Sequence, residues 1–291
     1  MDELELANEF DGQVPQLRAV AYRILGSLTE ADDAVQEAWL RLRRTDAEAI
    51  DSIERWLTTV VARICLNMLR SRKTRGEQPL EGFLPEPIID DPAAGADPEH
   101  EALLADSVGI ALQVVLDTLT PAERLAFVLH DMFAVPFDEI AAMVDRSPQA
   151  TRQLASRARR RVRDAAPSPD PDLIRQQAVV DAYFAAAREG DLEALVAVLD
   201  PEVVLRAHRR DSEPRKLRGA ARVARGAMAA RRFAPYVRAA LVNGAAGVIA
   251  FDRELPFAVL AFTVVGDRAV AIDVFNDPEL VARLDIRGIA A

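Results

Sequence analysis

The chain has 291 residues, a net charge of −10 and an apolar content of 50%, which suggests two or three domains with hydrophobic cores. Its single cysteine, Cys65, excludes an internal disulfide and a cysteine-based zinc site, and the three histidines show no ligand spacing. Aromatic residues make up 5%, too few for a platform on which nucleic-acid bases stack.

The chain begins with an acidic segment, Met1 to Glu5, whereas a signal peptide would be positively charged there. No apolar run approaches the length of a membrane-spanning helix. We therefore expect a cytoplasmic protein that has no membrane partner, binds no metal and needs no cofactor.

A first helix is predicted to begin at the segment from Thr29 to Asp32, which resembles a capping box. Its helical period places four residues on an inner side: Val35, Ala38, Trp39 and Leu42. The outer side holds Asp33, Gln36, Glu37 and Leu40. This outer side is acidic with one apolar element, which favours docking of a partner.

A second helix is predicted from Ile53 to Arg75. Its inner side holds Leu57, Val60, Val61, Ile64 and Met68, and another side holds Thr59, Arg63, Leu66, Asn67 and Arg70. The helix ends in four cations within six residues, which is more than its dipole requires. This end indicates a second nucleic-acid surface, with a solvated helix end as the alternative.

Two shifts in composition divide the chain. Residues 76–97 are rich in proline, glycine and acid, and a second proline-rich break spans 165–171. We expect domains at 1–75, 106–166 and 172–291, with 76–105 as a linker. The first two domains are predicted to be all-helical, and the third is predicted to contain both helices and strands.

The second domain contains the pattern of a helix-turn-helix. A capping box at Thr120 to Glu123 opens a supporting helix, and residues 136–144 form the next one. Residues 145–147 form a turn, Ser147 is the expected N-cap and Pro148 the first helical residue. From Arg146 to Arg163 there are seven arginines and no acid, which points to DNA phosphate as a partner.

The arginine-rich helix has two distinct sides. The inner residues are Thr151, Leu154, Ala155, Ala158 and Val162, and the outer ones are Gln149, Arg152, Gln153, Ser156, Arg160 and Arg163. Outward arginine and glutamine side chains can make bidentate contacts to guanine and adenine in a major groove. Arg157, Arg159 and Arg161 lie on the flanks and suit phosphates. A solvated arginine-rich helix in an ordinary bundle is the alternative.

The third domain is predicted to open with two helices that meet at Gly190. Short β-branched or aromatic runs then predict five strands, at residues 203–207, 236–241, 247–252, 258–265 and 268–275. Gly266 and Asp267 are the expected hairpin turn between the last two.

Four segments together resemble the successive signatures of extracytoplasmic-function sigma factors, in the same order and spacing. They are Asp32–Leu40, Arg55–Arg63, Leu119–Arg124 and Arg152–Arg159. The resemblance covers about residues 5 to 165. It implies a first domain that binds the RNA polymerase clamp helices and the −10 element, and a second that reads the −35 element.

The resemblance assigns site residues to three partners, and none of them is catalytic. The polymerase-binding residues are Asp33, Gln36, Glu37 and Leu40. The −10 residues, within the segment from Thr45 to Arg70, are Arg55, Thr59, Arg63, Asn67 and Arg70. The −35 residues are Gln149, Arg152, Gln153, Ser156, Arg157 and Arg160.

The third domain resembles the SnoaL-like, ketosteroid-isomerase-type cone that some of these sigma factors carry. The linker of such sigma factors often contains a Leu-Pro-Glu-Pro sequence, which here is Leu84-Pro85-Glu86-Pro87. Residues 276–280 fit this pattern, but 209–216 replace the family's glycine-rich stretch. An acid/base site would use Asp273 with His208 or Tyr183. We favour a hydrogen-bonded strand residue at Asp273, because fold alone does not imply catalysis.

The expected function is that of an alternative sigma subunit, which binds core RNA polymerase and promoter DNA. Its third domain would contact the first domain or the linker, or sense a small ligand. A helix-turn-helix repressor or activator, and an enzyme with a DNA-binding part, remain the alternatives. The sequence does not identify an anti-sigma partner.

Overall fold

A computed structural model of the chain describes residues 3–46, 50–74, 85–93, 109–165, 170–208, 215–284, 286 and 289. These residues form two compact units. The first contains 3–74 and 115–165, and the second contains 85–93, 109–114 and the residues from 170 onward. Within this described part, no helix is long and apolar enough to cross a membrane.

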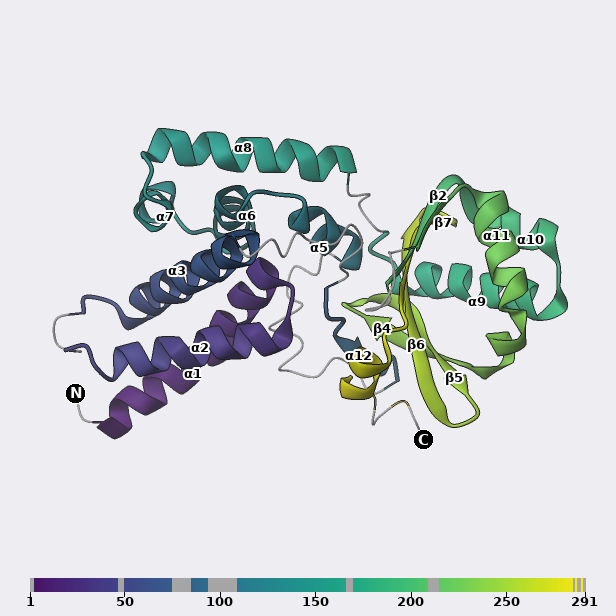
Figure 1. Cartoon of the computed structure of the whole chain (residues 1–291), viewed down its shortest axis with the longest axis horizontal. Coiled ribbons are helices and arrows are strands. Elements are labelled where there is room, and N and C mark those ends of the chain that lie inside the picture. The colour runs from purple at the N-terminus through teal and green to yellow at the C-terminus, as the bar shows by residue number, and fades with distance from the viewer. Residues whose placement is uncertain are drawn as a thin grey trace. The chain divides into compact units, whose positions relative to one another are not determined.

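The N-terminal half of the first unit is a bundle of three helices: α1 (Glu3–Leu25), α2 (Leu28–Leu42) and α3 (Ile53–Thr74) (Figure 1). The predicted start of α2 at Thr29 was wrong, because the Ser27 hydroxyl is the cap and accepts the N–H of Glu30 at 3.3 Å. Trp39 is half-buried and its ring lies 4.9 Å from that of Phe10. Cys65 is fully buried, as expected for a small apolar residue.

The second half of this unit contains the helix-turn-helix. Its elements are α6 (Pro121–Phe127), the π-helical turn η2 (Val128–Met132), α7 (Phe137–Val144) and α8 (Pro148–Ala165). The predicted capping box is confirmed, since Thr120 and Glu123 each accept the other's backbone N–H. α3 packs against α6 and α7, which joins the two helical domains into one unit.

A seven-stranded sheet forms the centre of the second unit, in the order β1-β4-β5-β6-β7-β2-β3. The strands are β1 (Ile89–Asp90), β2 (Leu199–His208), β3 (Arg215–Arg218), β4 (Val237–Val242), β5 (Ala245–Asp252), β6 (Leu255–Val265) and β7 (Arg268–Phe275). β2 and β7 are parallel and all other neighbours are antiparallel. The predicted turn at Gly266 is confirmed, with φ at +60°.

Six helical segments accompany the sheet: α5 (Ile110–Asp117), whose first residues belong to this unit, α9 (Leu173–Glu189), α10 (Leu192–Ala197), α11 (Ala220–Ala229), η3 (Arg231–Tyr236) and α12 (Pro278–Arg283). α9 and α10 meet at Gly190, whose φ of +79° suits glycine, as predicted. The domain is the expected α+β cone, which follows two all-α domains.

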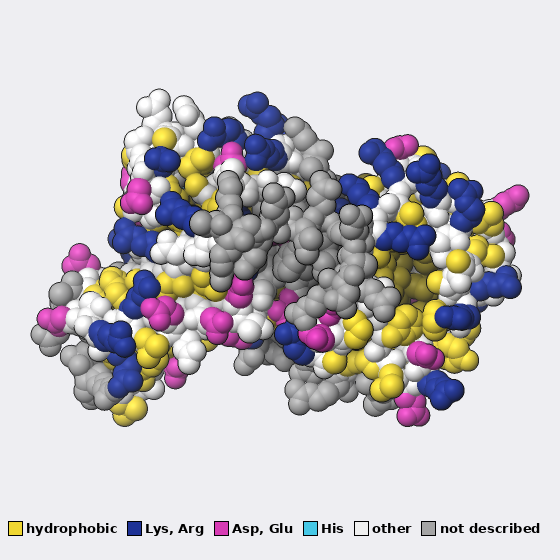
Figure 2. All heavy atoms as spheres, viewed as in Figure 1, with side chains coloured by type: hydrophobic (Ala, Val, Ile, Leu, Met, Phe, Trp, Pro, Cys, Tyr) yellow, Lys and Arg dark blue, Asp and Glu magenta, His cyan; other side chains and the backbone are white. Residues whose placement is uncertain are grey.

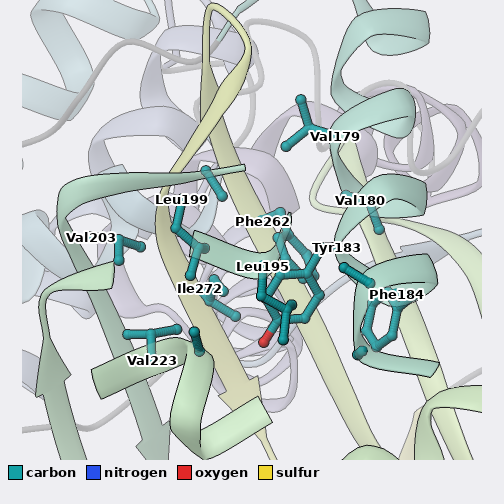
Figure 3. Close-up of a cluster of buried hydrophobic side chains, with 14 of the residues drawn as sticks. Val179, Val180, Tyr183, Phe184, Leu195, Leu199, Val203, Val223, Phe262 and Ile272 are labelled. Atoms are coloured by element: carbon teal, nitrogen blue, oxygen red, sulfur yellow. The ribbon is translucent and has the colours of Figure 1, made fainter. Parts of the chain in front are cut away.

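The sheet separates two hydrophobic cores. On one face Tyr183 of α9 and Leu195 of α10 pack against Phe262 and Ile272 of the sheet (Figure 3). On the other face Phe275 packs with Ile89, Ile110, Ile249 and other apolar residues. Residues from the expected linker therefore contribute to the core of the third domain.

That contribution comes from the two-residue strand β1. Ile89 lies opposite Val242 of β4, and the preceding Ile88 exchanges two hydrogen bonds with Asn243. The Ile88 N–H donates to the Asn243 Oδ1 at 2.9 Å, and the Asn243 N–H donates to the Ile88 carbonyl at 2.8 Å. The expected linker thus includes a buried strand as well as proline-rich sequence.

Candidate nucleic-acid interface

The turn between α7 and α8 sets the direction of the arginine-rich helix. α7 ends at Asp145, whose φ of +56° is left-handed, and Ser147 then caps α8 by accepting the Ala150 N–H at 3.2 Å. On α8, Thr151, Ala155 and Ala158 are fully buried. Because these side chains are small, α8 can pack closely against α6 and α7 and keep its opposite side free.

The free side of α8 carries the residues that were predicted to contact the −35 element. All six are exposed: Gln149, Arg152, Gln153, Ser156, Arg157 and Arg160. The Arg152 guanidinium lies 5.6 Å from the centre of the Phe137 ring, which orients it without neutralising it. The two predicted sides of the helix are therefore confirmed, whereas the contacts to bases stay a prediction.

Three of the flanking arginines pair with acids of the same domain. The carboxylate of Glu123 lies 3.3 Å from the Arg157 Nε and 3.1 Å from the Arg161 Nη1. The Arg159 Nε lies 2.5 Å from the Asp131 Oδ1. The sequence had assigned these arginines to phosphates. Their acidic partners were not predicted, because Glu123 lies on α6 and Asp131 on η2, both distant from α8 in sequence. The three side chains remain about half exposed, so pairing orients them while leaving donors on the surface.

Glu123 is the acid that links α6 to α8. Burial alone would raise the pKa of its carboxyl group, but hydrogen bonds from Thr120 and the positive charges of Arg161 and Arg157 outweigh that effect. The pKa is therefore lowered, and the carboxylate stays charged at neutral pH. One glutamate thus caps α6 and helps to fix two arginines of α8.

The outer side of α2 is a second candidate surface. Asp33, Gln36 and Leu40 are exposed, and Glu37 is partly exposed with its carboxylate 2.9 Å from Arg41. Leu40 leaves 39% of its surface in solvent, in the middle of these polar groups. The predicted outer side of α2 therefore faces solvent, and polymerase binding by its residues stays a prediction.

α3 carries the residues predicted for the −10 element, and the structure divides them into two groups. Asn67 and Arg70 are exposed and Thr59 is half-buried with its hydroxyl bonded to the Arg55 carbonyl. Arg55 pairs with Glu139 of α7, and Arg63 donates to the Ala142 carbonyl at 2.9 Å. Two of the five predicted residues thus contact the helix-turn-helix domain.

Two further expectations for α3 need correction. Leu66 was placed apart from the inner residues but is itself buried, because α3 packs against α6 and α7 as well as against α1 and α2. In the basic end, Arg72 pairs with Glu30 and donates to the Leu25 carbonyl at 3.2 Å. Arg72 therefore serves the bundle, and Arg75 lies outside the described residues.

A buried link between the two helical domains was not predicted from the sequence. Arg124 of α6 is buried, pairs with Asp117, and donates from Nε and Nη2 to the Arg23 carbonyl at 3.4 and 3.3 Å. That carbonyl lies in the last turn of α1, where helix carbonyls lack helical partners. Burial raises the pKa of Asp117 despite the nearby Arg124.

The residues considered for acid/base chemistry in the third domain do not form one site. Asp273 is buried and its two oxygens accept from the Arg206 guanidinium at 2.5 and 2.9 Å. It alternates with Ile272, so it lies on the sheet face opposite Tyr183. Burial raises the pKa of Tyr183, and the side chain of His208 lies outside the described residues. Asp273 is thus a hydrogen-bonded strand residue, as favoured.

Comparisons with known proteins cover nearly the whole chain. The family descriptions Sigma-70 region 2 and Sigma-70, region 4 match residues 11–75 and 110–162. The chain is 39% identical over 289 residues to the ECF RNA polymerase sigma factor SigJ of Mycobacterium tuberculosis, covering 96% of this chain and 90% of that protein. It is 36% identical over 184 residues to the probable ECF RNA polymerase sigma factor SigI of the same species, covering 63% of each.

A solved structure resembles the fold over the same length. The crystal structure of the extracytoplasmic function sigma factor SigJ of Mycobacterium tuberculosis matches with a TM-score of 0.77 and 33% sequence identity. The match covers 96% of this chain and 99% of that one, so it includes the third domain as well as the two helical ones.

Proposed function

Because the chain belongs to the extracytoplasmic-function (ECF) sigma factors, which bind core RNA polymerase and promoter DNA to start transcription, we propose a role for each exposed surface. α2 docks on polymerase, α3 contacts the −10 element and α8 contacts the −35 element. The proposal is carried by the match of both sigma regions to this chain. The exposure of six polar residues on one side of α8 supports the role of that helix. The family membership excludes a repressor that works without polymerase.

Base reading by α8 is supported by chemistry and position. Arg152 and Gln153 are exposed near the N-terminal end of the helix, which is the end that enters the major groove in helix-turn-helix proteins. Arginine pairs with guanine and glutamine with adenine through two hydrogen bonds each. Arg157, held beside Glu123, contacts phosphate and sets the register.

Polymerase docking by α2 is supported by its acidic outer side. Reversing the charges with Asp33→Lys and Glu37→Lys should abolish co-purification with core polymerase, because like charges would then meet across the interface. The matched control is Glu9→Lys with Asp11→Lys, two exposed acids of α1. Circular dichroism should show that both variants stay folded. Undiminished co-purification of the α2 variant would contradict the assignment.

Arg55 and Arg63 each contact α7 through one guanidinium nitrogen. Binding of the −10 element by the whole of both groups would replace these contacts. The free chain is therefore a closed form, which opens between α3 and α7 when polymerase and promoter are bound. Buried Arg124, at the contact between α6 and α1, holds the closed form together.

The third domain acts as a regulator through the linker. Its support is strand β1, which fixes residues 88–90 of the linker to β4. The linker joins the two helical domains. When part of it is bound to this sheet, less of its length is free to let the two domains move apart. Asp273, the carboxylate considered for acid/base chemistry, is held by Arg206, which supports a binding role for the domain. The whole protein acts in the cytoplasm with polymerase.

A further inference from the structure

The third domain carries a second basic region that its role as a regulator does not explain. From Arg215 to Phe251 the sequence contains eight cations and no acid, in a chain with a net charge of −10. Figure 2 shows Lys and Arg side chains gathered over the part of the second unit where Figure 1 places α11. This region lies outside both segments that match the sigma regions.

Three consecutive elements carry most of these cations, and α11 contacts the other two. β3 is the edge strand of the sheet, and Arg215 and Lys216 are exposed on it. α11 follows at once and buries Val223 and Ala224, so that Arg222 and Arg225, three residues apart, lie together on its outer side. α11 contacts β3 and η3, which adds Arg231 and Arg232.

Among the residues that the structure describes, few acids lie beside these cations. Arg218 pairs with Glu202 at 3.0 Å, and Arg232 stacks 4.6 Å from the centre of the Phe233 ring. Within the described ranges no acid contacts the remaining cations of the surface: Arg215, Lys216, Arg222, Arg225 and Arg231. We call these five residues with Arg232 the α11 surface.

Cations that are gathered in this way repel one another, and an anionic partner relieves that repulsion. Five of its six members are arginines, whose planar guanidinium matches phosphate with two hydrogen bonds. The exposed small residues Ala221 and Ala229 of α11 leave room for a bulky partner to approach. Large exposed aromatic rings that could stack bases are nearly absent from these three elements, with Tyr236 as the exception, which favours a duplex over a single strand.

We propose that the α11 surface binds the phosphate backbone of duplex DNA without reading its sequence. The third domain then adds a contact to DNA that the sigma regions do not provide. The contact raises the affinity of the whole chain for DNA and makes that affinity more sensitive to salt, since each neutralised phosphate releases counterions.

The test is the salt dependence of binding by the full chain to a duplex of random sequence, measured by fluorescence anisotropy between 50 and 200 mM salt. Arg222→Gln with Arg225→Gln removes two cations at exposed helical positions where glutamine is equally well tolerated. The logarithm of the binding constant falls with the logarithm of the salt concentration by about 0.9 per phosphate contact, so the loss of two contacts should make this slope shallower by about 1.8. The loss of affinity over this fourfold salt range should then be about 12-fold smaller than in the wild type.

The matched control neutralises two exposed arginines of the same unit at hairpin turns, Arg253→Gln and Arg268→Gln. It should leave the salt slope unchanged. An unchanged slope in the α11 variant, or an equal fall in the control, would overturn the proposal. The assay contains no polymerase, so its outcome is independent of the proposed polymerase contact of α2, and the contribution of α8 is the same in the wild type and in both variants.

A photo-crosslinking amino acid at Ala229, within the complex of polymerase, full chain and promoter, identifies the partner directly. Crosslinking to DNA is expected, because Ala229 is exposed beside the α11 surface. Crosslinking to a polymerase subunit or to the transcript in place of DNA would overturn the assignment to duplex DNA.

Discussion

The contact between the linker and the third domain depends on one side chain that can be removed with little other change. Asn243 adopts φ of +49°, a left-handed conformation, and its Oδ1 accepts the buried Ile88 N–H at 2.9 Å. Asn243→Gly removes the acceptor and keeps the backbone, because glycine adopts this φ without strain. The variant therefore isolates the hydrogen bond that holds β1.

The expected size of the effect follows from burial. Ile88 and Asn243 leave 2% and 5% of their surface exposed, so water cannot easily replace the lost acceptor. An unsatisfied buried N–H costs about 1–3 kcal/mol. The released population of β1 should therefore rise by about 5- to 150-fold.

Hydrogen exchange of the peptide that contains residues 85–90, measured by mass spectrometry on the full chain, reports this release. Exchange should accelerate in Asn243→Gly and remain near the wild-type rate in Asn243→Asp, which keeps an oxygen acceptor. Equal exchange in the glycine variant and the wild type would refute the reasoning. A truncation near Pro171 is a poorer test, because it would expose the apolar Ile89 and Ile110.

Three further predictions concern the first unit. Replacing Arg152 or Gln153 by alanine should cost about 1–3 kcal/mol at particular base pairs of the −35 element, and equal loss on every sequence would contradict base reading. Glu139→Gln should strengthen binding of a single-stranded −10 oligonucleotide up to about fivefold, since the exposed pair with Arg55 is worth at most about 1 kcal/mol; unchanged binding would argue against a closed form. Glu123→Gln should lower the free energy of unfolding by about 1 kcal/mol at pH 7. Because the folded-state pKa of Glu123 is lowered from 4.5, this difference should be present above pH 4.5 and disappear as the pH falls through the folded-state pKa; a difference that persists in acid would contradict the charge argument.

Helical periodicity predicted much of the first unit. The two sides of α8, the capping box at Thr120 and the outer side of α2 were all found as expected, because each depends on residues close in sequence. The cap of α2 was placed two residues late, since Ser27 and Thr29 are both good capping residues. Which of them caps depends on where the chain turns after α1.

Contacts between distant segments could not be predicted in the same way. Leu66 and Arg63 both follow the helical period, and only the packing of α3 against α7 decides that one is buried and the other bonded to Ala142. The strand β1 has two residues, too short for any periodic signal, and its partner Asn243 is 155 positions away. β3 and α11 were not predicted; β3 has four residues, which are too few for a periodic signal.

This chain directs core RNA polymerase to particular promoters. The most direct measurement maps the 5′ ends of transcripts made in vitro by core polymerase from templates with randomised upstream sequence, with and without the full chain. With the chain, starts should lie downstream of two shared motifs, and Arg152→Ala should weaken the preference in the upstream motif alone. The same distribution of starts with and without the chain would contradict the account.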